Sequence, residues 1–256
     1  MLILKLITVP FFILILSLAG KKWGTQLVGN LAGLPVVTGP IVCFLILDQG
    51  IDFGYKASIS AIYGCISIMV FGLVYCWACQ HRRYISCLIV AILAWLITSY
   101  LVSLLPTNLT LACGLTIVCI AFMPKLLPPI FHKKPLPQTL KDLPFRLIVG
   151  GLLSFLTIIS ADQLGSVWGG ILSSFPINSL VLTSFTHRTF GDEYVVPIYR
   201  GLAKGIYSFV AYFALQALLI HTMSLWQVTL LSIFASIMVQ VIIQKWQLLQ
   251  RSNSNA

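Results

Sequence analysis

The residues of this chain best suited to bind a small molecule gather beside two prolines that interrupt long apolar runs. Their hydroxyl, amide and amino groups could hold a solute through hydrogen bonds and charge, without covalent chemistry. The candidate substrate-binding residues are Asn30, Pro35, Thr38, Ser173, Ser174, Pro176, Asn178, Ser179 and Lys204.

The two prolines predict breaks in membrane helices. Proline has no backbone N–H, and its ring collides with the carbonyl four residues earlier. We therefore expect the carbonyls of Leu31 and Leu172 to lose their helical partners because of Pro35 and Pro176. An unpaired carbonyl at membrane depth costs several kcal/mol, so each should meet a neighbouring helix, a hydroxyl, water or a ligand. A kinked packing helix that binds nothing is the alternative.

Lys204 stands one helical turn after Arg200, on the same face of an apolar run. A cation at membrane depth is expensive and is often functional. Lys204 could hold an anionic substrate or carry a coupling proton. Alternatively, both side chains extend to anionic lipid headgroups at the membrane surface.

Other chemistry finds little support. The sequence has no G-x-S-x-G, phosphate-cradling loop or H-E-x-x-H motif, and we expect no enzyme and no cofactor. Cys76 and Cys79 form a C-x-x-C pair, but no second cluster completes four ligands, so we expect no metal site. The net charge of +10 lies in short clusters between apolar runs, which argues against a nucleic-acid partner.

The composition predicts the elements that position these residues. Hydrophobic residues make up 59% of the chain and charged residues 9%, too little charge to cover a water-soluble domain. The apolar runs approach the roughly 20 residues that cross a bilayer as a helix. The fold class is therefore an all-α, polytopic membrane helical bundle with about nine transmembrane helices. The predicted spans are 2–19, 24–47, 57–79, 84–105, 108–123, 146–160, 166–186, 197–220 and 224–246.

The basic residues support this number of spans. All but Lys5 and Lys56 of the 16 lysines and arginines fall on one side when the loops alternate. By the positive-inside rule, the N-terminus is outside and the C-terminus is cytoplasmic. The lipid bilayer is the expected partner, and a homodimer is left open.

A shift of 141 positions places the two proline segments on each other. Pro35 falls on Pro176, Gly50 on Gly191 and Gly64 on Gly205. We expect two four-helix repeats, inverted because five helices separate their starts. The expected domains are 1–105 (first repeat), 106–145 (connector helix and Pro/Lys-rich cytoplasmic linker), 146–250 (second repeat) and 251–256 (disordered tail).

The stretch from Trp168 to Pro176, with Arg200-Gly201 and Tyr207-Ser208-Phe209, resembles the GlpM-like group of small bacterial inner-membrane proteins. The likeness covers mainly the seventh and eighth spans. It implies a duplicated or fused unit in a bacterial inner membrane, with no defined activity and no catalytic residue.

Inverted repeats that each carry a broken helix are typical of secondary transporters. We therefore expect a transporter or exporter of a small, perhaps anionic, solute that works by alternating access. The alternatives are a membrane scaffold that helps assemble a cell-envelope complex, a lipid-translocating variant of the transporter, and a channel whose pore is lined by polar kinked helices.

Overall fold

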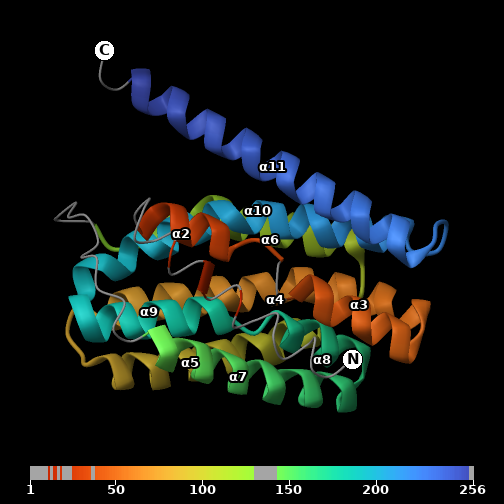
Figure 1. The fold of residues 1–256 in the computed structure, drawn as a ribbon, viewed down its shortest axis with the longest axis horizontal. Coiled ribbons are helices and arrows are strands. Elements are labelled where there is room, and N and C mark those ends of the chain that lie inside the picture. The colour runs from red at the N-terminus through yellow and green to blue at the C-terminus, as the bar shows by residue number, and fades with distance from the viewer. Residues whose placement is uncertain are drawn as a thin grey trace.

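The computed structural model describes residues 11, 14–15, 18, 25–35, 38–129 and 143–253, and within them every regular element is a helix (Figure 1). The elements are α2 (Thr25–Ala32), α3 (Thr38–Gln49), α4 (Ile51–Ala78), α5 (Tyr84–Ser103), α6 (Leu109–Leu126), α7 (Leu143–Gln163), α8 (Gly165–Ser173), α9 (Ile177–Phe190), the 3₁₀ turn η1 (Asp192–Tyr194), α10 (Val195–Leu219) and α11 (Leu225–Asn253).

The fold class is confirmed at the level of an all-helical chain with membrane-like helices. Five helices are long and apolar enough to cross a membrane: Ile51–Ala78, Tyr84–Ser103, Leu109–Leu126, Asp192–Leu219 and Leu225–Trp246. The expected spans 24–47 and 166–186 each appear as two shorter helices that follow one another in the sequence. These are α2 and α3 for the first span, and α8 and α9 for the second. The expected first span, 2–19, lies almost wholly outside the described residues.

The expected C-terminal boundary moves. Helix α11 continues to Asn253, so residues 251–253 of the expected disordered tail are helical, and 254–256 lie outside the described residues. The helix continues there because nothing before Asn253 stops it; neither glycine nor proline occurs in this stretch.

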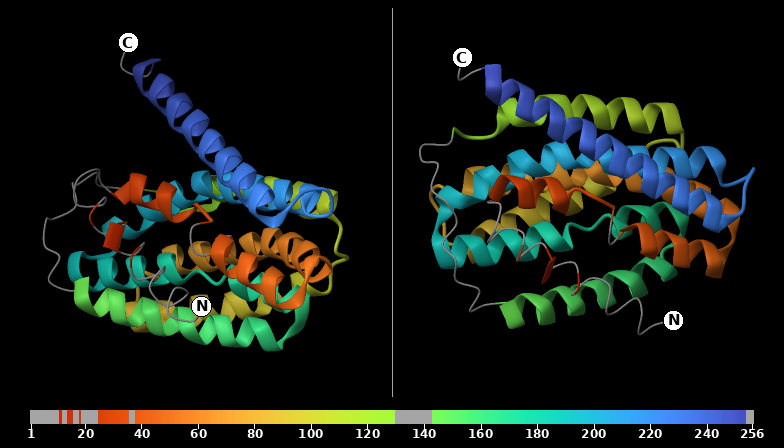
Figure 2. Two further views of the ribbon diagram at one scale, coloured as in Figure 1. Left: turned by 45° about the vertical axis from the view of Figure 1, so that its right-hand side comes forward. Right: turned by 45° about the horizontal axis from the view of Figure 1, so that its top comes forward.

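Helices α4 and α10 form the centre of the bundle. Their most apolar segments are 78% and 61% buried, against 22% for α6 and for α11. α2 packs on α10, α8 packs on α4, and α5 and α6 cover α4. Both views of Figure 2 show α11 crossing α10 obliquely, and its left view shows the C-terminal end of α11 directed away from the bundle. The outer helices therefore present apolar side chains outward, as a lipid-facing surface requires.

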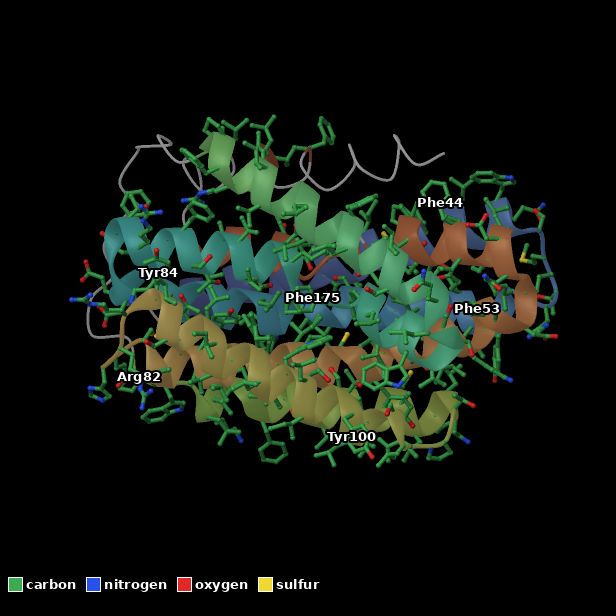
Figure 3. The ribbon with its side chains drawn as sticks, turned by 90° about the horizontal axis from the view of Figure 1, so that it is seen from below. Phe44, Phe53, Arg82, Tyr84, Tyr100 and Phe175 are labelled. Atoms are coloured by element: carbon green, nitrogen blue, oxygen red, sulfur yellow. The ribbon has the colours of Figure 1, made fainter. Side chains whose placement is uncertain are left out.

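Basic side chains gather at one end of the bundle. Arg188 lies over the ring of Tyr84 at 5.8 Å, and the Nη2 of Arg200 donates to the Pro128 carbonyl at 3.2 Å. Figure 3 shows Arg82 and Tyr84 at this end and Phe53 at the opposite end. This end therefore carries basic side chains from α9, α10 and the turn between α4 and α5, together with the acidic residues of η1.

Two glycines make the sharp junctions that follow the broken helices. Gly50 joins α3 to α4 with φ +93° and ψ 175°, and Gly191 joins α9 to η1 with φ +105° and ψ 174°. A side chain is disfavoured at such positive φ values, so glycine is required at both corners.

Candidate functional site

The carbonyls of Leu31 and Leu172 keep partners in their own helices. The Leu34 amide donates to the Leu31 oxygen at 3.1 Å, and the Phe175 amide donates to the Leu172 oxygen at 2.8 Å. The expectation that these carbonyls must seek another helix or a ligand is therefore wrong. A tightened 3₁₀ turn satisfies them one residue before each proline.

Beyond each proline the chain re-enters a helix in the same way. The Gly39 amide donates to the Pro35 carbonyl at 2.8 Å, and the Leu180 amide donates to the Pro176 carbonyl at 2.7 Å. The Ile177 amide also donates to a carbonyl within its break, that of Phe175, at 2.7 Å. Several N–H groups at the starts of α3 and α9 are therefore already bonded within the breaks.

The two breaks touch each other in the middle of the bundle. The Thr38 hydroxyl donates to the Ser173 carbonyl at 2.9 Å, across 135 residues of sequence. Both side chains are buried, Thr38 at 6% exposure and Ser173 at 1%. A pair of breaks far apart in the chain thus forms one structural unit.

A small cavity of about 40 Å³ lies where the breaks meet. This volume is enough for roughly three water molecules. Its lining comes from both breaks and from the two central helices. The lining residues are Ala32, Gly33, Leu34, Thr38, Ile68, Ser174, Phe175, Pro176, Ile177, Asn178, Ser179, Leu202, Ile206 and Phe209.

Four polar side chains take part in this lining. Ser174 donates its hydroxyl proton to the Ala61 carbonyl at 3.1 Å and shares it with the Gly170 carbonyl at 3.2 Å. Asn178 has its amide oxygen buried without a hydrogen-bond partner among the described residues. Ser179, which is 3% exposed, and Thr38 complete the set.

Apolar side chains line the rest of the cavity. Ile68 comes from α4, and Leu202, Ile206 and Phe209 come from α10. The ring of Phe175 meets Trp95 edge-on, with centroids 4.8 Å apart, which fixes its position halfway along the bundle (Figure 3). Sequence reasoning missed these residues, although Ile68 and Phe209 are themselves 141 positions apart.

The structure brings together five of the nine candidate residues at the cavity, Thr38, Ser174, Pro176, Asn178 and Ser179, and joins Ser173 to them through Thr38. Pro35 is buried in its break but does not line the cavity.

Asn30 and Lys204 also lie away from the lining. The backbone carbonyl of Asn30 packs against Gly205, one turn before the break. The side-chain amide oxygen of Asn30 has no hydrogen-bond partner among the described residues. Lys204 is half-buried on α10. It misses the cavity because the lining residues Leu202 and Ile206 occupy a different face of that helix.

The cavity lining carries no charged side chain. In the described part of the chain, no group of three or more His, Cys, Asp or Glu residues is placed to hold a metal ion. The arrangement can therefore act on a solute by size, hydrogen bonds and backbone dipoles.

A second polar contact lies at the basic end of the bundle. His187 lies in the last turn of α9. Its Nδ1 is 3.2 Å from the hydroxyl oxygen of Tyr75. Burial lowers the pKa of His187 below its ordinary value, and nearby Asp192 acts in the opposite direction. The neutral imidazole is therefore favoured in the folded protein.

The chain matches no family model, and neither a curated protein nor a solved structure shows significant similarity to it. The resemblance to the GlpM-like group stays a prediction.

Proposed function

We propose that this protein is an integral membrane secondary transporter or exporter of a small solute, working by alternating access between two inverted four-helix units. The cavity carries the proposal, because it lies where the two broken helices meet and both halves contribute to its wall. Transporter folds built from inverted repeats place their binding sites at such discontinuous helices, near the bilayer midplane.

Helix boundaries support the repeat. A shift of 141 residues carries α4 from Ile51–Ala78 onto residues 192–219, which are η1 and α10 together. The same shift carries the start of α5 at Tyr84 onto the start of α11 at Leu225. Gly50 and Gly191, which the shift also relates, share the same unusual backbone conformation.

Packing between the halves is reciprocal. A Cβ on Gly29 of α2 would overlap the Ile198 carbonyl of α10, and a Cβ on Gly170 of α8 would overlap the Ala57 carbonyl of α4. Gly29 and Gly170 are 141 positions apart, and so are Ala57 and Ile198. Each half thus offers its short helix to the long helix of the other half, as a two-fold relation requires.

We infer that the cavity lies on the two-fold axis of the proposed repeat. Four pairs of lining residues are related by the same shift: Gly33 with Ser174, Leu34 with Phe175, Thr38 with Ser179, and Ile68 with Phe209. A site on the axis is equally close to both halves. Rocking one half against the other would therefore expose it to each side in turn.

The solute must be small, and the cavity does not favour an anion through side-chain charge. Lys204, the cation expected to hold an anionic solute, lies outside the lining. Support for transport therefore comes from the matched breaks and not from this lysine. The cavity at Thr38 and Asn178 also favours transport over a scaffold, whose kinks would be filled by packing alone.

We further propose that the basic end of the bundle faces the cytoplasm of a bacterial cell and that the N-terminus lies outside. Arg82, Arg188 and Arg200 at this end support that orientation under the positive-inside rule.

The breaks can be tested by Pro35→Ala and Pro176→Ala. Both variants should insert normally but lose transport, since restored helical bonding would stiffen the breaks. Proteoliposomes loaded with a defined mixture of organic acids, amino acids and sugars would be followed by mass spectrometry of the released solutes. Pro124→Ala, which alters a proline inside α6 away from the breaks, is the matched control. Wild-type flux in both break variants would refute the proposal.

A further inference from the structure

We propose that the cavity between the two breaks binds a monovalent alkali-metal cation through neutral oxygens. This inference rests on the proposed transport function and names a coupling ion for the same site.

The first argument is an excess of hydrogen-bond acceptors. A hydroxyl has one proton and two lone pairs. Thr38 commits its proton to the Ser173 carbonyl, and Ser174 commits its proton to the Ala61 and Gly170 carbonyls. What these two side chains can still offer a ligand is lone pairs, which suit a cation and not an anion.

Asn178 adds another acceptor. Its amide oxygen is buried without a hydrogen-bond partner among the described residues, and the residue lines the cavity. Burying an unpartnered carbonyl-type oxygen costs about 1–3 kcal/mol. A bound cation would remove that cost by accepting the oxygen as a ligand.

The backbone at the breaks points the same way. Helix α8 ends at Ser173, and its C-terminal end, like that of α2, reaches the cavity, where the helix dipole presents partial negative charge. The starts of α3 and α9 have the opposite sign. However, the Gly39, Ile177 and Leu180 amides there already donate to carbonyls within the breaks. Three donors at the helix starts are therefore withdrawn from a ligand.

The cavity lining contains no acidic side chain, which favours a monovalent over a divalent cation. Divalent cations are normally held with carboxylates, which offset their higher cost of dehydration. Neutral oxygens alone suit a monovalent ion, as in sites built from backbone carbonyls. The volume of about 40 Å³ accommodates such an ion together with one or two water molecules, at roughly 10–15 Å³ for each water.

The experiment measures the thermal unfolding midpoint of the full chain in detergent at constant ionic strength. Sodium, potassium or lithium chloride replaces N-methyl-D-glucamine chloride, and in a second series gluconate replaces chloride. Binding to the folded state alone should raise the midpoint by several degrees with one of the alkali cations. An unchanged midpoint with all three cations, or a shift that follows the anion, would overturn the proposal.

Variants assign the effect to the cavity. Asn178→Ala and Ser179→Ala should each weaken the apparent cation affinity about tenfold or more, the equivalent of one lost ligand. Ser179→Thr keeps a hydroxyl at this position, as at its repeat mate Thr38, and should retain the wild-type cation affinity. Ser184→Ala is the control, because Ser184 is buried on the same helix and bonds only to α9 carbonyls. Equal cation affinity in all four variants would also refute the site.

The outcome separates this proposal from the transport proposal. Cation-dependent stability without solute flux would retain the ion site and reject transport. Solute flux that is indifferent to alkali cations would retain transport and reject the ion site.

Discussion

Thr38 and Ser173 join the two broken helices through one buried hydrogen bond of 2.9 Å. The bond links the start of α3 to the end of α8, and thus links the two halves of the chain at the cavity. The shift of 141 residues relates Thr38 to Ser179 and Ser173 to Ala32. If the halves exchange roles during transport, the equivalent bond in the opposite state joins Ser179 to the Ala32 carbonyl.

Thr38→Val should weaken this link while keeping the side-chain shape. The Ser173 carbonyl would be left buried without its partner, at a cost of about 1–3 kcal/mol in the free energy of unfolding. Transport should fall as well. Unfolding in mixed micelles and flux in proteoliposomes measure the two effects. Thr98→Val removes a comparable hydroxyl, which bonds Ala94 within α5, and should change flux little.

Alanine at the two matched glycines should disrupt the contact between the halves. At Gly29 the new methyl group would overlap the Ile198 carbonyl, and at Gly170 it would overlap the Ala57 carbonyl. Overpacking of this kind costs about 1–3 kcal/mol. Gly114→Ala is the control, because a Cβ there meets nothing within 4 Å and alanine favours the α6 helix. Similar stability for all three variants would contradict the close packing.

The inverted arrangement can be tested by labelling two loop positions. Arg82 lies between α4 and α5, and Met223, 141 residues later, lies between α10 and α11. In a variant with all seven native cysteines replaced, Arg82→Cys should react with a membrane-impermeant maleimide from the cytoplasm only. Met223→Cys should react from outside only. Labelling of both positions from the same side would rule out inverted repeats.

His187 should make stability depend on pH. The pKa of this imidazole is lowered in the folded protein from its ordinary 6.5, chiefly by burial. The unfolded chain therefore takes up the proton first as pH falls. The free energy of unfolding should decline below pH 6.5, towards the lowered pKa, by at most about 1.4 kcal/mol per pH unit. Unfolding measured from pH 7.5 to pH 5 checks this, and His187→Gln should flatten the decline.

The sequence predicted the breaks well because proline acts locally. Pro35 and Pro176 end their helices wherever those helices pack, and the constant shift between them predicted that the two breaks would be alike. The fate of the Leu31 and Leu172 carbonyls was not predictable from that rule, because a 3₁₀ turn costs little and satisfies them.

The cavity wall was predicted less well because it depends on tertiary packing. Lys204 stood out by its charge, but the face of α10 that meets the breaks carries Leu202 and Ile206. Helical periodicity separates these residues from Lys204, yet only the packing of α10 shows which face is inside. Asn30, predicted to bind the solute, is buried but lies one turn too early in α2 to reach the cavity.

The uncharged lining has an electrical consequence. A carrier whose binding cavity holds no fixed charge moves only the charge of its cargo when the halves rock. With a monovalent cation aboard, the loaded step would feel the membrane potential by about 2.3 kcal/mol per 100 mV for a full crossing. The empty return step would be nearly indifferent to voltage, so a change in potential would accelerate one half of the cycle alone.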